Sequence, residues 1–112
     1  MDQPPFITKD SGERQEFTSG MVRDTGDKAR YDLVYLPLIT RWAELMQRGA
    51  KKYGERNWEK ASGQAELQRF KASAWRHFIS AITDVQDGED HFAATLFNLG
   101  AILYLKEKVN GG

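Results

Sequence analysis

Hydrophobic residues recur at steps of three and four positions from residue 64 to 85, which predicts a helix with one buried face. The stripe consists of Leu67, Phe70, Ala74, Phe78, Ala81 and Val85. His77 lies beside the stripe, and Asp84 follows two turns later on the same predicted face. The acidic run at 87–90 then interrupts the pattern. This arrangement favours a polar site between packed helices.

A second helix is predicted from His91 to about Lys108, and it is apolar on most of its surface. One stripe contains Phe92, Leu96, Leu99 and Leu103, and the remaining surface carries Ala93, Phe97, Ala101, Tyr104 and Leu105. Such a helix is buried on nearly all sides. In a chain this small a second copy is the simplest cover, so we expect a homo-oligomer, either a dimer or a dimer of dimers.

A further helix is predicted from Pro37, which suits a first helical turn, to Gly54, which suits a helix end. Its stripe consists of Leu38, Trp42, Leu45, Met46, Gly49 and Tyr53. Residues 1–27 are rich in Gly, Ser, Thr, Asp and Arg, and we expect an extended or flexible arm there. The expected architecture is all-α, with one helical domain over 28–112.

Composition narrows the function classes. The 112 residues include 16 Lys plus Arg and 16 Asp plus Glu, so the formal net charge is zero and no basic field indicates nucleic acid. The absence of cysteine excludes disulfides and thiolate zinc sites. The start does not resemble a signal peptide, and the apolar segment at 92–105 is too short to span a bilayer. We expect a soluble cytoplasmic protein that binds neither nucleic acid nor membrane.

Each predicted helix carries one pair of polar residues seven positions apart, and two turns of helix place such a pair on one face. The pairs are Glu44 with Lys51, His77 with Asp84, and His91 with Asn98. If the pairs converge, they form a pocket of carboxylate, imidazole, amide and ammonium groups; ordinary positions at the edge of the core are the alternative. The loop at 54–63 adds Arg56, Asn57 and Trp58, which either grip a nucleotide or, for Trp58, cover the core.

Four strings carry a family resemblance: FTSGMVRDTGDKARYDL at 17–33, RGAKKYGERNWEK at 48–60, WRHFISAI at 75–82 and GEDHFAATLFN at 88–98. With them the chain resembles the N-terminal domain of the phage dATP/dGTP diphosphohydrolases, which are grouped with the MazG-like nucleotide pyrophosphohydrolases. The resemblance implies a small MazG-like helical bundle that acts on deoxypurine nucleoside triphosphates. The EExxE and ExxD clusters that bind magnesium in the wider group are absent from the predicted helices.

The implied reaction converts dGTP or dATP to the monophosphate and pyrophosphate with Mg²⁺, and Mn²⁺ is a second candidate. His77 and Glu44 are the expected catalytic residues, with His77 orienting or deprotonating the attacking water. The expected metal ligands are drawn from Glu44, Asp84, Asp87, Glu89 and Asp90. The expected substrate-binding residues are Lys28, Arg30, Lys51, Tyr53, Arg56, Asn57, Trp58, His91 and Asn98.

Two functions of other classes remain open. The chain could bind a nucleotide without cleaving it and so sequester a signal nucleotide of host defence, since capture requires cations and aromatic rings but no metal. It could also be a helical protein–protein module whose apolar last helix docks on a host target. Magnesium-dependent turnover separates the enzyme from both alternatives.

Overall fold

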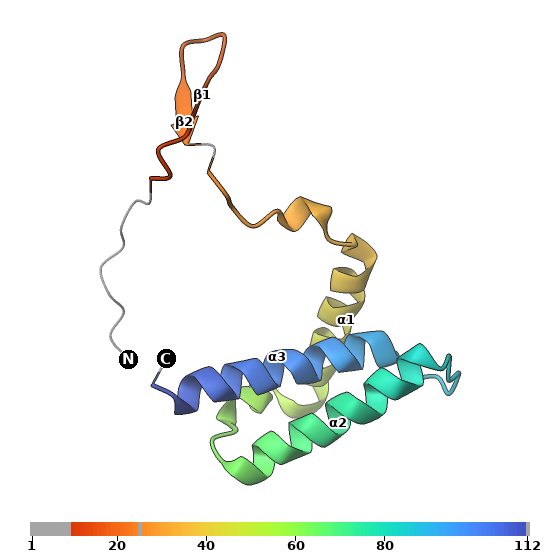
Figure 1. The fold of residues 1–112 in the computed structure, drawn as a ribbon. Coiled ribbons are helices and arrows are strands. Elements are labelled where there is room, and N and C mark those ends of the chain that lie inside the picture. The colour runs from red at the N-terminus through yellow and green to blue at the C-terminus, as the bar shows by residue number, and fades with distance from the viewer. Residues whose placement is uncertain (1–9, 25, 112) are drawn as a thin grey trace. The chain divides into compact units, whose positions relative to one another are not determined.

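The computed structural model describes residues 10–24 and 26–111, and it confirms the all-α prediction. In chain order the elements are β1 (Arg14–Glu16), β2 (Val22–Asp24), the 3₁₀ turn η1 (Tyr31–Leu33), α1 (Leu36–Tyr53), the 3₁₀ turn η2 (Asn57–Lys60), α2 (Gln64–Ile82) and α3 (His91–Val109) (Figure 1). None of the described helices is long and apolar enough to cross a membrane.

The chain divides into two compact units, with the boundary between Val34 and Tyr35. In the first unit β1 and β2 form an antiparallel hairpin in which Gln15 pairs with Arg23. Three-residue strands are too short to show an alternating pattern, so the sequence predicted only an extended arm here. Residues 1–9 and 25 of that arm lie outside the described residues, and the division at 27/28 stays a prediction.

The ends of α1 follow from the residues predicted to set them. Pro37 lies in the first turn, where its missing N–H leaves no helical bond unmade. At the other end the N–H of Gly54 donates to the Ala50 carbonyl at 2.9 Å, and Gly54 has a φ of 95°. Glycine adopts positive φ at little cost, which explains why the helix stops there.

α2 begins where the Glu66 side chain reaches back to accept the N–H groups of Ser62 and Gly63, at 2.9 and 3.0 Å. It ends at Ile82, so the prediction of a helical face shared by His77 and Asp84 is wrong. Asp84 has a φ of 59°, and this left-handed conformation ends the helix.

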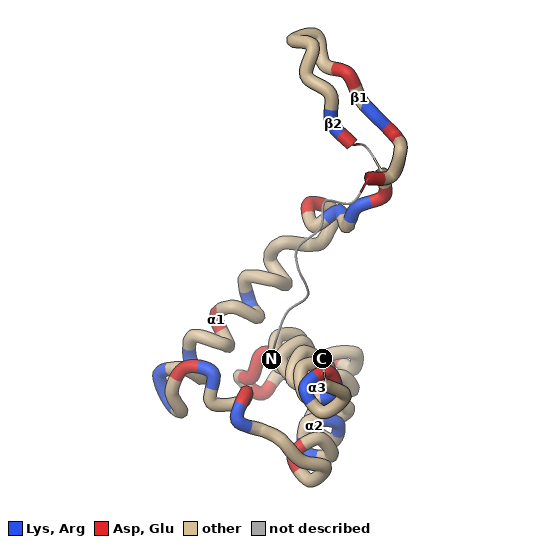
Figure 2. The backbone as a smooth tube through the Cα atoms, turned by 90° about the vertical axis from the view of Figure 1, so that its left-hand side faces the viewer, with Lys and Arg blue, Asp and Glu red and all other residues tan. Residues whose placement is uncertain are grey.

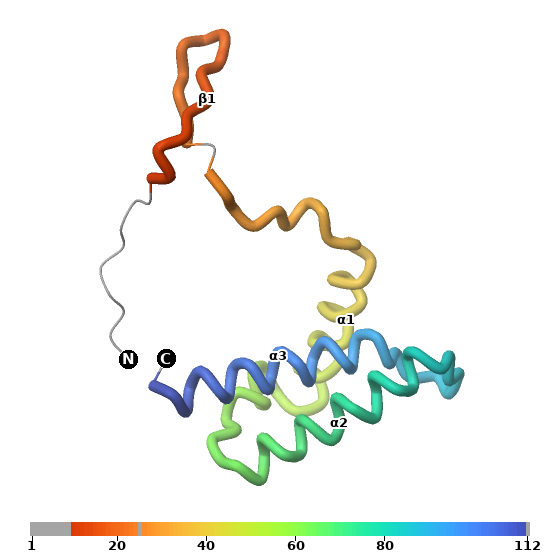
Figure 3. Tube along the Cα trace, viewed as in Figure 1, coloured from red at the N-terminus to blue at the C-terminus, as the bar shows by residue number. Residues whose placement is uncertain are grey.

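α3 is the centre of the second unit, since it packs against α1, α2 and η2. α2 and α3 run side by side in Figures 1 and 3. Small residues on α3 let its neighbours lie close: Ala93 and Ala101 are fully buried, and a Cβ at Gly100 would lie 3.3 Å from the ring of Trp42 on α1. Leu105 joins Ala61 and Leu67 in the core, with Phe70 and Ile102 packed against them.

Part of α3 is uncovered in the single chain. Phe92, Leu99 and Leu103 are 46%, 51% and 58% exposed. Within the single chain α3 is therefore not buried on nearly all sides, and the second copy expected to cover this surface stays a prediction. Figure 2 shows acidic and basic residues alternating through the segment that follows α1.

Candidate functional site

A groove of about 610 Å³ lies in the second unit, between α1 and α2, with η2 and α3 completing its walls. α2 contributes Glu66, Phe70, Ser73 and His77 at steps of three and four, which places them on one helical face. Ala94, Phe97 and Asn98 of α3 also line the groove. A volume of this size matches the usual range for small-molecule sites.

Aromatic side chains form one part of the groove wall. Trp58 meets Phe97 and Tyr104 edge to face, with ring centroids 6.1 and 5.1 Å apart, and Phe70 meets Phe97 in the same way at 6.3 Å. Tyr53 at the end of α1 also lines the groove and is 62% exposed. This wall offers aromatic surface on which a planar base can stack.

Polar side chains line another part of the groove. His77 follows Phe70 by two turns of α2, which separates the two along the helix by roughly 10 Å. Ser73 lies between them, and Glu89 lies near the start of α3. Asn98 is buried, lines the groove and donates from Nδ2 to the Ala94 carbonyl at 2.8 Å.

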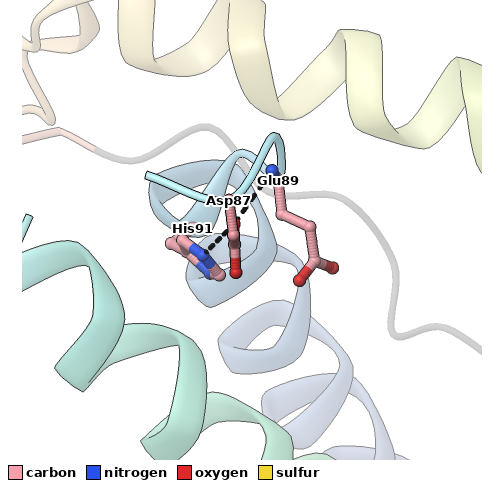
Figure 4. Close-up of side chains that lie close together, drawn as sticks. All are labelled: Asp87, Glu89 and His91. Atoms are coloured by element: carbon pink, nitrogen blue, oxygen red, sulfur yellow. Dashed lines mark hydrogen bonds and ion pairs between the residues drawn. The ribbon is translucent and has the colours of Figure 1, made fainter. Parts of the chain in front are cut away.

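His77, His91 and Asp87 form a hydrogen-bonded chain. The Nδ1 atoms of His77 and His91 lie 2.9 Å apart, and Nε2 of His91 lies 2.8 Å from Oδ1 of Asp87. Figure 4 shows the Asp87 carboxylate between His91 and Glu89. Burial lowers the pKa of His77, with neighbouring His91 acting in the same direction and Glu89 opposing it. His91 itself is 6% exposed.

The same turn carries a candidate group of metal ligands. Ligand atoms of Asp87, Glu89 and His91 lie within 4.8 Å of one another. Both ring nitrogens of His91 are hydrogen-bonded, and Oδ1 of Asp87 accepts from the Glu89 N–H and faces His91, so the candidate donors are the Glu89 carboxylate and the second oxygen of Asp87. The N–H of Glu89, followed by His91, lowers the pKa of Asp87 and keeps it ionised. Two exposed carboxylates fit Mg²⁺ or Mn²⁺, which take hard oxygen ligands and retain waters.

Asp90 holds the start of α3 in place. Both of its oxygens accept from Arg41 at 2.7 Å, and Oδ1 also accepts the Ala93 N–H at 3.1 Å as the N-cap of the helix. The hydrogen bonds from Arg41 are the main cause that lowers the pKa of Asp90, and burial of the carboxyl acts in the opposite direction. Because both oxygens are already occupied, the structure disfavours Asp90 as a metal ligand.

A family model described as dATP/dGTP diphosphohydrolase, N-terminal, matches residues 18–111. The chain belongs to this family. The match confirms the resemblance carried by the four sequence strings, and it covers the whole groove and the hydrogen-bonded turn at 87–91. No curated protein and no solved structure matches the chain.

The structure brings many of the predicted site residues to the groove. Those that line it are Tyr53, Arg56, Asn57, Trp58, His77, Glu89 and Asn98. Asp87 and His91 adjoin them through the hydrogen bond to His77. Their roles toward a ligand stay predictions.

Other predicted residues lie elsewhere. Glu44 and Lys51 are exposed on α1 and are not among the described residues that line the groove, and Asp84 lies beyond the end of α2. Of the three polar pairs, only His91 and Asn98 therefore lie on one helix with both members at the groove or hydrogen-bonded to a residue that lines it. Lys28 and Arg30 belong to the first unit, where Arg30 pairs with Asp32 at 2.8 Å.

Sequence reasoning missed three contributors, and one of them is Lys60 of η2, which lines the groove. Ser73 lies four residues before His77 on α2, so the helical spacing was a signal that could have identified it. Arg41 is separated from Asp90 by 49 positions, and nothing local in the sequence indicates this pairing.

Proposed function

We propose that the chain hydrolyses a deoxypurine nucleoside triphosphate, dGTP or dATP, to the monophosphate and pyrophosphate in this groove. The observation that carries the proposal is that one groove offers both aromatic and polar side chains. Tyr53 and Trp58 offer stacking surface for a purine, while His77 and Glu89 lie on the same groove. A purine nucleotide combines the same two kinds of group, an aromatic base joined through a sugar to charged phosphates. The family assignment independently points to the same substrates.

In the proposed reaction a water oxygen bonds to the α-phosphorus while the bond to the α–β bridging oxygen breaks, and that oxygen leaves with pyrophosphate. His77 accepts the proton of the attacking water. Arg56 and Lys60, both on the groove, bind the leaving phosphates. Asp87 and Glu89 would hold Mg²⁺ or Mn²⁺, which neutralises phosphate charge when bound.

The test is incubation of the protein with each of the four dNTPs and four NTPs, with Mg²⁺ or Mn²⁺, followed by chromatography of the products. We expect dGMP or dAMP together with pyrophosphate. His77→Gln should lower turnover by about 10²- to 10⁴-fold, the usual contribution of a positioned general base. Glu107→Gln, at an exposed position near the end of α3, is the control and should leave turnover unchanged.

Other outcomes would contradict the proposal. Release of inorganic phosphate would place cleavage at a different bond. Thermal stabilisation by a nucleotide without any product would identify a binding protein, and signal nucleotides would be tested next. A lack of response to all eight nucleotides would leave the groove without its proposed substrate.

We also propose that the chain self-associates through an apolar face on α2 and α3, defined by Trp75, Phe78, Leu99 and Ile102. These residues line a hollow of about 370 Å³, and Trp75 is 68% exposed. Monomeric proteins seldom leave large contiguous apolar patches uncovered. We place this oligomer in the cytoplasm, where its nucleotide substrates are found.

A further inference from the structure

His91 is buried between two polar partners, and each of its ring nitrogens faces one of them. We propose that His91 is a positioning residue that fixes the tautomer of His77, so that the bare Nε2 of His77 faces the groove. Asp87 in turn sets the tautomer of His91. The inference rests on the proposed function, in which His77 accepts a proton from water.

The direction of the first hydrogen bond follows from Asp87. Its Oδ1 accepts the backbone N–H of Glu89 at 3.1 Å and lies 2.8 Å from Nε2 of His91. An ionised carboxylate can only accept hydrogen bonds. The hydrogen between Asp87 and His91 therefore belongs to Nε2 of His91.

The direction of the second bond follows from the first. A neutral imidazole carries one N–H, so Nδ1 of His91 is a bare acceptor once Nε2 holds the hydrogen. Nδ1 of His77, 2.9 Å away, must then be the donor. With its hydrogen on Nδ1, neutral His77 has a lone pair on Nε2, the nitrogen that does not face His91.

The geometry of the two rings supports this bond. Their centroids are 5.1 Å apart and their planes are inclined by 35°. The centroid distance exceeds the nitrogen–nitrogen distance by nearly the sum of the two ring radii, so the nitrogens meet edge to edge rather than in a stack. An in-line approach of this kind is what a hydrogen bond between rings requires.

Histidine tautomers can be read directly from ¹⁵N NMR of the full chain labelled at histidine, without substrate and at a pH where both rings are neutral. We expect the Nδ1–H form for His77 and the Nε2–H form for His91. Because the chain contains two histidines, His77→Gln assigns the signals. An Nε2–H form of His77 in the wild-type protein would overturn the proposal.

Asp87→Asn tests the transmission through His91. Asparagine can donate as well as accept, so it no longer dictates the tautomer of His91. We expect both tautomers to become populated at His91 and, through it, at His77, although Asp87 and His77 share no hydrogen bond in the described part of the chain. Unchanged His77 nitrogen shifts in Asp87→Asn would contradict the coupling.

Enzyme kinetics provide the last test of the proposal. His91→Phe keeps a buried ring but removes both hydrogen bonds, so kcat should fall by about 10- to 100-fold, a part of what a positioned base contributes, while KM stays within about twofold. Glu107→Gln is the control. An unchanged kcat in a folded His91→Phe protein would overturn the proposal. If the wild-type protein cleaves no nucleotide, the proposed function fails, and the NMR measurements still decide the tautomer separately.

Discussion

Arg41 and Asp90, 49 positions apart, form a two-pronged ion pair in which both bonds measure 2.7 Å. Asp90 is at the same time the N-cap of α3, and His91 is the first residue of that helix. Arg41 also lies over the Phe92 ring, 5.4 Å from its centroid. α1 therefore fixes the point at which α3 begins, and with it the position of His91.

The two roles of Asp90 can be separated by substitution. Asp90→Ala removes the cap and the ion pair, and we expect the free energy of unfolding to fall by about 1–2 kcal/mol. Asp90→Asn retains a capping oxygen and loses only the charge, so its loss should be clearly smaller, because Arg41 is half exposed. Urea unfolding followed by circular dichroism measures both. Equal losses would show that the ion pair, rather than the cap, dominates.

Glu66 makes the stability depend on pH. The N–H of Ser62, followed by that of Gly63, lowers the pKa of Glu66 below its value in the unfolded chain. A lowered folded pKa gives stability that is present above the unfolded pKa of about 4.3 and lost as the pH falls through the folded value. We expect thermal midpoints to decline in this acid range. In Glu66→Gln, which retains the acceptor oxygen, the decline should be shallower, and an identical slope would contradict this cause.

Tyr53 is expected to stack on the substrate base. It lines the groove and is largely exposed, so Tyr53→Ala should weaken binding of the purine nucleotide with little effect on folding. Loss of about 1 kcal/mol of stacking corresponds to roughly a fivefold higher Kd by isothermal titration. Tyr35→Ala removes a similarly exposed tyrosine, 74% exposed, that is not among the described groove residues, and it should bind as the wild type does. Equal effects of the two variants would argue against stacking at the groove.

Removal of the divalent ion should abolish turnover, and restoration should depend on the turn before α3. Asp87 and Glu89 are the proposed carboxylate ligands there, so Glu89→Gln should raise the Mg²⁺ or Mn²⁺ concentration needed for half-maximal activity by about tenfold or more. A metal titration after treatment with EDTA measures this shift. Glu107→Gln should follow the wild-type curve. Activity that persists in EDTA would exclude the proposed metal role.

Much of the fold could be predicted from the sequence, because the residues that determine these helices lie close to one another in the chain. Pro37 and Gly54 set the ends of α1, and the three-and-four spacing identified α2 and α3. The end of α2 could not be predicted. The hydrophobic pattern continues to Val85, whereas the left-handed backbone conformation of Asp84 ends the helix. A single residue in that conformation leaves no periodic signal.

The candidate site could be predicted only in part, for a related reason. His77 and Glu89 were predicted as site residues from their neighbours in the sequence, and both line the groove. The pairing of His77 with His91, and that of Arg41 with Asp90, depends on how separate helices pack. Glu44 shows the converse, since its spacing on α1 was correct while its side chain is exposed outside the groove.

The apolar face on α2 and α3 gives the last prediction. Trp75 packs edge to face on Phe78 with ring centroids 6.3 Å apart, and in a single chain most of its surface remains exposed. If a second copy covers this face, Trp75→Glu places a charge in the interface and should convert the oligomer to a monomer, measured by sedimentation equilibrium. The monomer should keep its helical circular dichroism, because an exposed residue contributes little to the fold. Gln47→Glu makes the same charge change at an exposed position of α1 and should leave the oligomer intact, whereas an oligomer that persists in Trp75→Glu would assign the interface to another surface.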